Sequence, residues 1–113
     1  MSAFLYHMAS RADWERAEAE GVYYGSPDDH RDGFMHFSTA SQVAESARRH
    51  RAGQTDLLLI VVPEEAVGPW KWEEARNGSL FPHLYAHLPV KAVVGVHELS
   101  LGEDGLHVFP PLL

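Results

Sequence analysis

The apolar positions of this chain fall into short runs, of which the longest covers residues 57–62. Every position in that run is Leu, Ile or Val, so both faces of an extended segment would be apolar. Such a run is typical of a central strand that is covered on each side, and Pro63 is expected to end it because proline cannot donate to the sheet. Shorter runs predict strands or extended segments at residues 4–8, 22–24, 34–37, 70–72, 80–85, 91–99 and 106–109.

A first helix is predicted after residues 4–8. Ser10 with Asp13 three positions later resembles a helix-start capping pair, and Gly21 is suited to end the helix in the left-handed conformation. Residues 25–33 are dense in Gly, Ser, Pro and Asp, which favour turns. We therefore expect residues 25–33 to be an exposed loop.

A second helix is predicted after the strand at residues 34–37. Ser38 or Thr39 is expected to cap it, with Gln42 three residues after Thr39, and apolar residues then recur at helical spacing. Basic side chains at 48–51 suit the last turn of a helix, and Gly53 is expected to end it.

Length and composition fit one globular domain. The chain has 113 residues, 45% of them apolar, which is enough for a core without metal or disulfide. The expected fold is α+β, a single domain over residues 1–113 with a mixed or antiparallel sheet and about two helices. The chain has no cysteine, which excludes disulfides, thiolate nucleophiles and Cys-ligated metals.

Charge and hydropathy limit the expected location of the protein and the classes of partner that it could bind. The N-terminus lacks the basic and apolar regions of a secretory signal, and the run at 57–62 is too short to span a bilayer. A cytoplasmic protein without a membrane partner is expected. The formal net charge of −7 argues against a nucleic-acid partner, whose phosphates require a basic surface. The oligomeric state stays open.

Candidate chemistry lies in polar residues at the ends of the predicted strands. No P-loop, dinucleotide fingerprint, Gly-x-Ser-x-Gly elbow or His-Glu-x-x-His motif occurs. Strand alternation puts His36 and Ser38 on one face, where they could line a site for a polar ligand. Equally, His36 could be a structural histidine bonded to the backbone while Ser38 caps a helix. The full set of candidates is His7, Asp32, His36, Ser38, Thr39, Glu73, Arg76, His83 and Tyr85.

A metal site is the rival chemistry. His36, His83, His87 and Asp32 are acceptable ligand types, but nothing in their spacing specifies a metal, and we expect none. Prolines flank His83 and His87 and disfavour a helical i, i+4 pair.

Several blocks, in their order along the chain, resemble the bacterial domain-of-unknown-function family 952. They are His7, residues 32–39 (DGFMHFST), Gln42, residues 53–57 and residues 72–85, which contain the unusual run LFPHLY. The resemblance covers nearly the whole chain, and it implies the ADP-ribosyltransferase fold with which that family is grouped.

A more distant resemblance is to the C-terminal lobe of NAD-dependent RNA 2′-phosphotransferases. The order of blocks is similar: a strand ending in His7, a hydrophobic-His-hydrophobic-Ser block at residues 35–38, an Arg-His pair at 49–50, the strand 57–62 and an Asn-Gly pair at 77–78. This resemblance implies NAD as cofactor or substrate. It also implies that no RNA-binding lobe is present in this chain, so RNA is not the expected substrate.

The same resemblance implies roles for particular residues. His7 would bind ribose hydroxyls and His36 would line the nicotinamide-ribose pocket, so both are the implied catalytic residues. The implied cofactor-binding residues are His7, Met8, His36, Ser38, Thr39 and Arg49. Asp32, Glu73, Arg76, His83 and Tyr85 are further cleft candidates, and Glu73 is conceivable as a third catalytic group.

The leading hypothesis is an ADP-ribosyltransferase-like domain that binds NAD or a related nucleotide and transfers or hydrolyses ADP-ribose. Met8 and Ala9 stand where the phosphotransferases have Gly-Thr, and a methionine side chain there narrows the approach of nicotinamide. The second hypothesis is therefore a non-catalytic module for a small ligand or a protein on the same fold. A metal-dependent enzyme that uses the histidines is the third.

Overall fold

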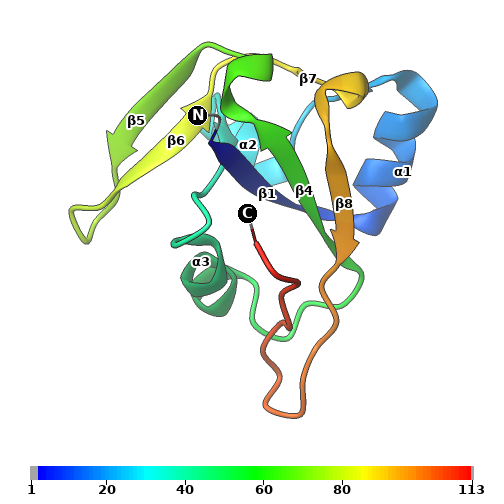
Figure 1. Ribbon diagram of the computed structural model, residues 1–113, viewed down its shortest axis with the longest axis vertical. Helices are drawn as coiled ribbons and strands as arrows, with labels where there is room; N and C mark the ends of the chain where they lie inside the picture. The colour runs from blue at the N-terminus through cyan, green and yellow to red at the C-terminus, as the bar shows by residue number, and fades with distance from the viewer. Residues whose placement is uncertain (1–2, 113) are drawn as a thin grey trace.

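The apolar run forms the middle strand of a three-stranded antiparallel sheet in the computed structural model, which describes residues 3–112 (Figure 1). Strand β4 (Leu57–Pro63) lies between β1 (Phe4–Ser10) and β8 (Gly95–Glu98). The prediction of a central strand is therefore confirmed.

Further helices and strands surround this sheet. The α-helices of the described residues are α1 (Arg11–Glu20), α2 (Pro27–Asp32) and α3 (Val43–His50). The other strands are β2 (Val22–Tyr23), β3 (Met35–His36), β5 (Trp70–Glu74), β6 (Leu80–Leu84) and β7 (Leu88–Pro89). Strand pairing is antiparallel throughout these elements, so the fold is α+β as predicted.

Both faces of the central sheet are covered, which explains why β4 has no polar position. Leu58 belongs to one core cluster with Trp14 of α1, whereas its neighbour Leu59 belongs to a second cluster with Val43 of α3. The strand thus separates two layers of core. Burial of apolar area on both faces is what stabilises this part of the molecule.

Helix α1 has the predicted ends. The Ser10 hydroxyl accepts a hydrogen bond from the Asp13 backbone N–H at 3.1 Å, and Gly21 ends the helix with φ of 84°. The chain then enters β2, which pairs with β7.

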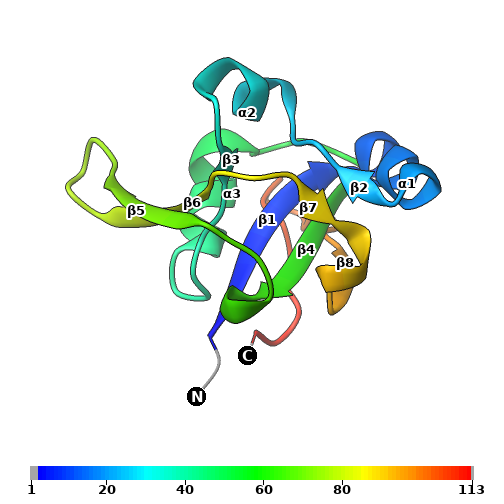
Figure 2. The ribbon, with the colours of Figure 1, turned by 90° about the horizontal axis from the view of Figure 1, so that it is seen from above.

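A second sheet carries a β-hairpin away from the central sheet (Figures 1 and 2). Its order is β3–β6–β5, and the hairpin β5–β6 turns at Asn77 and Gly78. A bridge between Ser38 and Tyr6 joins the end of this sheet to β1. The strands of the described residues thus form three small antiparallel sheets rather than one sheet, and the bridge brings the end of β3 beside β1.

The prediction of an exposed loop at residues 25–33 is wrong. Most of it is helix α2, which lies on one side of the central sheet (Figure 2). Ser26 and Asp29 form a capping box, Pro27 occupies the first turn, and Gly33 ends the helix with φ of 84°. The turn-forming residues mark the two ends of a short helix, so there are three α-helices in the described chain rather than about two.

Helix α3 begins later and ends earlier than predicted. Its N-cap position is Gln42, whose side-chain Oε1 accepts from the Thr39 backbone N–H at 3.0 Å, so residues 39–42 form a turn before the helix. The C-cap residue is Arg51, two residues before Gly53, which was expected to end the helix.

The predicted closing hairpin near residues 106–109 is reduced to a turn with one antiparallel bridge. Leu101 pairs with His107, and no strand is formed at residues 106–109. No helix within residues 3–112 is both long and apolar enough to cross a membrane.

Candidate functional site

A cavity of about 330 Å³ opens where β1, α2, the end of β3 and α3 meet. Six of the candidates from the sequence line it, although they come from segments far apart in the chain. They are His7, Met8, Asp32, His36, Ser38 and His83. Since His7, His36 and His83 face one cavity, they could act on one ligand.

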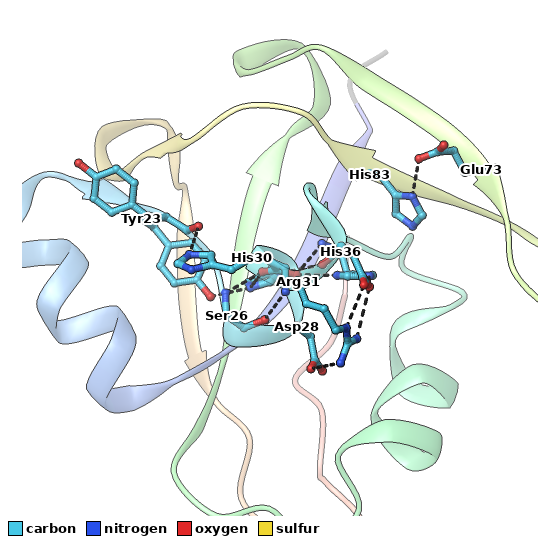
Figure 3. Close-up of polar contacts among 12 residues, drawn as sticks. Tyr23, Ser26, Asp28, His30, Arg31, His36, Glu73 and His83 are labelled. Carbon is cyan, nitrogen blue, oxygen red and sulfur yellow. Dashed lines mark hydrogen bonds and ion pairs between the residues drawn. The ribbon is translucent and has the colours of Figure 1, made fainter.

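His36 is held between two carboxylates (Figure 3). Its Nδ1 donates to Asp29 Oδ1 at 2.6 Å, and its Nε2 forms an ion pair with Asp32 Oδ2 at 3.0 Å. The hydrogen bond to Asp29, together with both negative charges, raises the pKa of His36 above 6.5. The two carboxylates therefore favour the protonated form of the ring and fix its orientation.

Asp29 is the residue that the sequence interpretation missed. It is 3% exposed, and its carboxylate accepts from the backbone N–H groups of Ser26 at 2.8 Å and His36 at 3.1 Å, in addition to the His36 ring. Burial alone would raise the pKa of Asp29, but these hydrogen bonds and nearby His7 lower it well below its usual range. The signal available in the sequence was Ser26 followed by Pro27 and then Asp29, which is a capping-box spacing.

His7 is buried in the floor of the site, at 3% exposure. Its Nδ1 donates to the His36 carbonyl oxygen at 2.6 Å, which leaves Nε2 to accept from the Tyr23 hydroxyl at 2.8 Å. Burial lowers the pKa of His7 below 6.5 and raises that of Tyr23. His7 is therefore a neutral ring whose two nitrogens both have partners within the protein.

A second polar group lies on the hairpin, beside His83. Glu73 Oε1 accepts from His83 Nδ1 at 2.8 Å and from the Tyr85 hydroxyl at 2.7 Å. The bond from His83 lowers the pKa of Glu73. Phe34 stacks on the His83 ring with centroids 4.1 Å apart, and its own ring lies 4.8 Å from that of His36. Glu73 and Tyr85 do not line the cavity, but hydrogen bonds connect them to His83, which does.

Three predicted residues lie elsewhere. Thr39 bonds to the Ser41 hydroxyl, Arg49 pairs with Glu45 at 2.7 Å, and Arg76 is exposed in the turn of the hairpin. None of the three is among the residues that line the cavity. Arg51, which the sequence did not single out, lines it instead.

The histidines do not form a metal-binding group within residues 3–112, where no three His, Asp or Glu side chains are arranged to hold an ion. His87 packs against Tyr24, with ring centroids 4.6 Å apart. It lines a separate open groove of about 400 Å³ together with Phe34 and Tyr85.

The fold and site define a small α+β protein with a polar, histidine-lined cavity beside a covered antiparallel sheet. The chain belongs to the family described as "Protein of unknown function (DUF952)", whose profile matches residues 8–96. A search of curated proteins gave no match.

Solved structures of one relative resemble the chain closely. The crystal structure of protein CC0527 from Caulobacter crescentus is 40% identical, with 93% of each chain covered and a TM-score of 0.87. A crystal structure of its double mutant gives the same values. The solution NMR structure of CC0527 is 41% identical over 91% of this chain and 90% of that one, with a TM-score of 0.82.

Proposed function

We propose that this chain binds NAD or a related nucleotide in the cavity as a cytoplasmic domain of ADP-ribosyltransferase type, and transfers or hydrolyses ADP-ribose. The observation that carries the proposal is the convergence of His7, His36 and His83 on one cavity. A volume of about 330 Å³ lies within the range of about 300–1,000 Å³ that small-ligand sites occupy.

The side chains around the cavity suit a nucleotide. The Ser38 hydroxyl offers a donor for hydroxyl or phosphate oxygens, the His36 ring is oriented by Asp29 and Asp32, and Phe81 offers an apolar wall for a planar ring. When bound, NAD supplies an ADP-ribosyl group attached to nicotinamide through a labile bond. The fit therefore depends on donors that are already oriented, which favours a polar ligand over an apolar one.

Asp32 and His36 would do the chemical work. A hydrogen bond from Arg31 lowers the pKa of Asp32, so its carboxylate is ionised at the mouth of the cavity. An ionised oxygen there stabilises positive charge that develops on a ribose. Asp29 holds the His36 ring so that the pair keeps its geometry without a ligand.

The test measures NAD binding by thermal shift and nicotinamide release by chromatography. His36→Gln removes the imidazole ring, and His97→Gln changes an exposed histidine on β8 as the matched control. We expect release to fall at least about tenfold in His36→Gln, because one oriented catalytic group contributes about that much or more, and to persist in His97→Gln. A wild-type protein that neither binds nor cleaves NAD at millimolar concentration would refute the proposal.

A non-catalytic ligand-binding module is the second candidate. The observation in its favour is that both ring nitrogens of His7 and of His36 already have protein partners, while the Met8 side chain helps to fill the cavity. This candidate predicts nucleotide binding in the thermal-shift assay without any release of nicotinamide.

A further inference from the structure

The charges around the cavity are balanced on one wall only. Arg31, from α2, lies 3.2 Å from Asp28 and 3.0 Å from Asp32, and His36 lies between Asp29 and Asp32. Both basic side chains on this wall, Arg31 and His36, therefore face carboxylates.

The opposite wall, at the end of α3, carries a cation that no carboxylate neutralises. Within residues 3–112 no Asp or Glu forms an ion pair with Arg51, whose guanidinium donates only to Gln54 Oε1, at 3.4 Å. The positive charge of Arg51 reaches the interior of the protein. After burial, this charge is one of the causes that lower the pKa of His7. Although the chain has a net charge of −7, an arginine without a carboxylate partner among residues 3–112 lines the cavity.

Further donors lie on this wall. The hydroxyls of Ser38 and Ser46 are 3.4 Å apart and line the cavity, as does the ring of His50. A guanidinium beside two hydroxyls offers several hydrogen-bond donors to one group, and a phosphate has enough acceptor oxygens to use them.

We propose that Arg51 binds the phosphate of a nucleotide 5′-phosphate, with Ser38 and Ser46 completing the phosphate site. The inference rests on the proposed function and narrows its ligand. A cavity of about 330 Å³ is at the small end of the usual range, so it holds a mononucleotide, and the adenosine half of NAD lies outside it.

Arg49 provides the sharpest contrast. It lies two residues before Arg51, pairs with Glu45 at 2.7 Å and does not line the cavity. The proposal assigns the phosphate to Arg51, whereas Arg49 is the cofactor-binding arginine that the resemblance to the phosphotransferases implies. Substituting each residue by Gln removes the same charge from the same short segment.

The experiment compares nicotinamide mononucleotide with nicotinamide riboside, which lacks the phosphate, by isothermal titration calorimetry. We expect Arg51→Gln to weaken mononucleotide binding about tenfold or more and to leave riboside binding unchanged, since a charge-assisted bond is lost. Arg49→Gln and the exposed Arg16→Gln are expected to match the wild type. Arg51→Lys keeps the charge and is expected to recover part of the affinity.

The other outcomes overturn the inference, the proposed function or both. An Arg51→Gln protein that is folded by circular dichroism and keeps its mononucleotide affinity, or an Arg49→Gln protein that loses it, overturns the inference. Binding of AMP or inorganic phosphate that depends on Arg51, without binding of NAD or nicotinamide mononucleotide, supports the phosphate site and overturns the proposed function. No binding of any of these phosphates to the wild type overturns both.

Discussion

Two regions of this protein bury side chains of different kinds and are stabilised by different forces. Strand β4 of the central sheet buries Leu, Ile and Val and has no polar side chain. The segment of residues 26–36, which holds α2 and β3, buries Ser26 and Asp29 and places Asp29 next to buried His7. Hydrophobic burial is non-directional, whereas buried hydrogen bonds require particular partners.

The difference predicts how each region responds to substitution. A core of aliphatic residues accepts another side chain of similar volume at a small cost, because contacts can rearrange. A buried carboxylate has no such freedom, since a donor that loses its partner stays buried and unsatisfied. Residues 26–36 should therefore be the more sensitive to changes that preserve shape but alter charge.

Asp29→Asn is the substitution with the largest expected effect. Asn keeps the shape but removes the charge that holds the His36 ring, so we expect a loss of about 2–3 kcal/mol in the free energy of unfolding. Denaturation by urea, followed by circular dichroism, measures this loss. Nucleotide binding should weaken as well, because His36 loses its fixed orientation.

Asp28→Asn is the matched control for that prediction. Asp28 is the preceding residue, and its exposed side chain pairs with Arg31 at the surface. An exposed ion pair contributes at most about 1 kcal/mol, so this variant should stay close to the wild type. Equal losses in the two variants would show that residues 26–36 depend on α2 in general rather than on the buried carboxylate.

The contrast also explains what could be predicted from the sequence. The run at 57–62 specifies a strand locally, because six apolar positions have no other stable place than a core, and that prediction is confirmed. Asp29 was missed because capping boxes are read with an apolar helix after them, and α2 is polar along its length. Asp29 is buried because it contacts His36 of β3 and His7 of β1, and a local sequence pattern does not show such contacts.

The position of the arginines shows a second limit. Arg49 lies in α3, whereas Arg51 is the C-cap residue with φ of −128°, so the helical repeat that predicts the direction of Arg49 does not predict that of Arg51. The sequence predicted a helix capped by Ser38 or Thr39, but the turn at residues 39–42 delays its start. The grouping of His7, His36 and His83 likewise depends on how β1, β3 and β6 are placed, and only the structure supplies that.

The two helix caps allow a smaller test of the same comparison. Ser10 begins α1 beside the central sheet, and Ser26 begins α2, each with its hydroxyl accepting a backbone N–H. We expect Ser10→Ala and Ser26→Ala each to lower the free energy of unfolding by about 1 kcal/mol. Ser26→Ala alone should also weaken nucleotide binding in calorimetry, because α2 lines the cavity. An equal loss of binding in both variants would contradict the assignment of α2 to the site.

The smallest effect concerns pH, for which the two histidines act in opposite directions. The pKa of His7 is below 6.5 in the folded protein, so its contribution to stability is present above pH 6.5 and is lost as the pH falls. The pKa of His36 is above 6.5, so its contribution is complete below pH 6.5 and is lost as the pH rises through the folded value. Above pH 6.5, only His36 of this pair still changes.

His36→Gln should therefore abolish a decrease in stability that the wild type shows on the alkaline side. Because the His36 side chain is 41% exposed, solvent screening limits that decrease to under about 1 kcal/mol. Urea unfolding of the wild type, His36→Gln and the exposed control His97→Gln at pH 6.5, 7.5 and 8.5 measures it. If His36→Gln lost as much stability as His97→Gln over this range, the ion pair with Asp29 would not contribute to folding, and the polar region would owe its stability to its neutral hydrogen bonds alone.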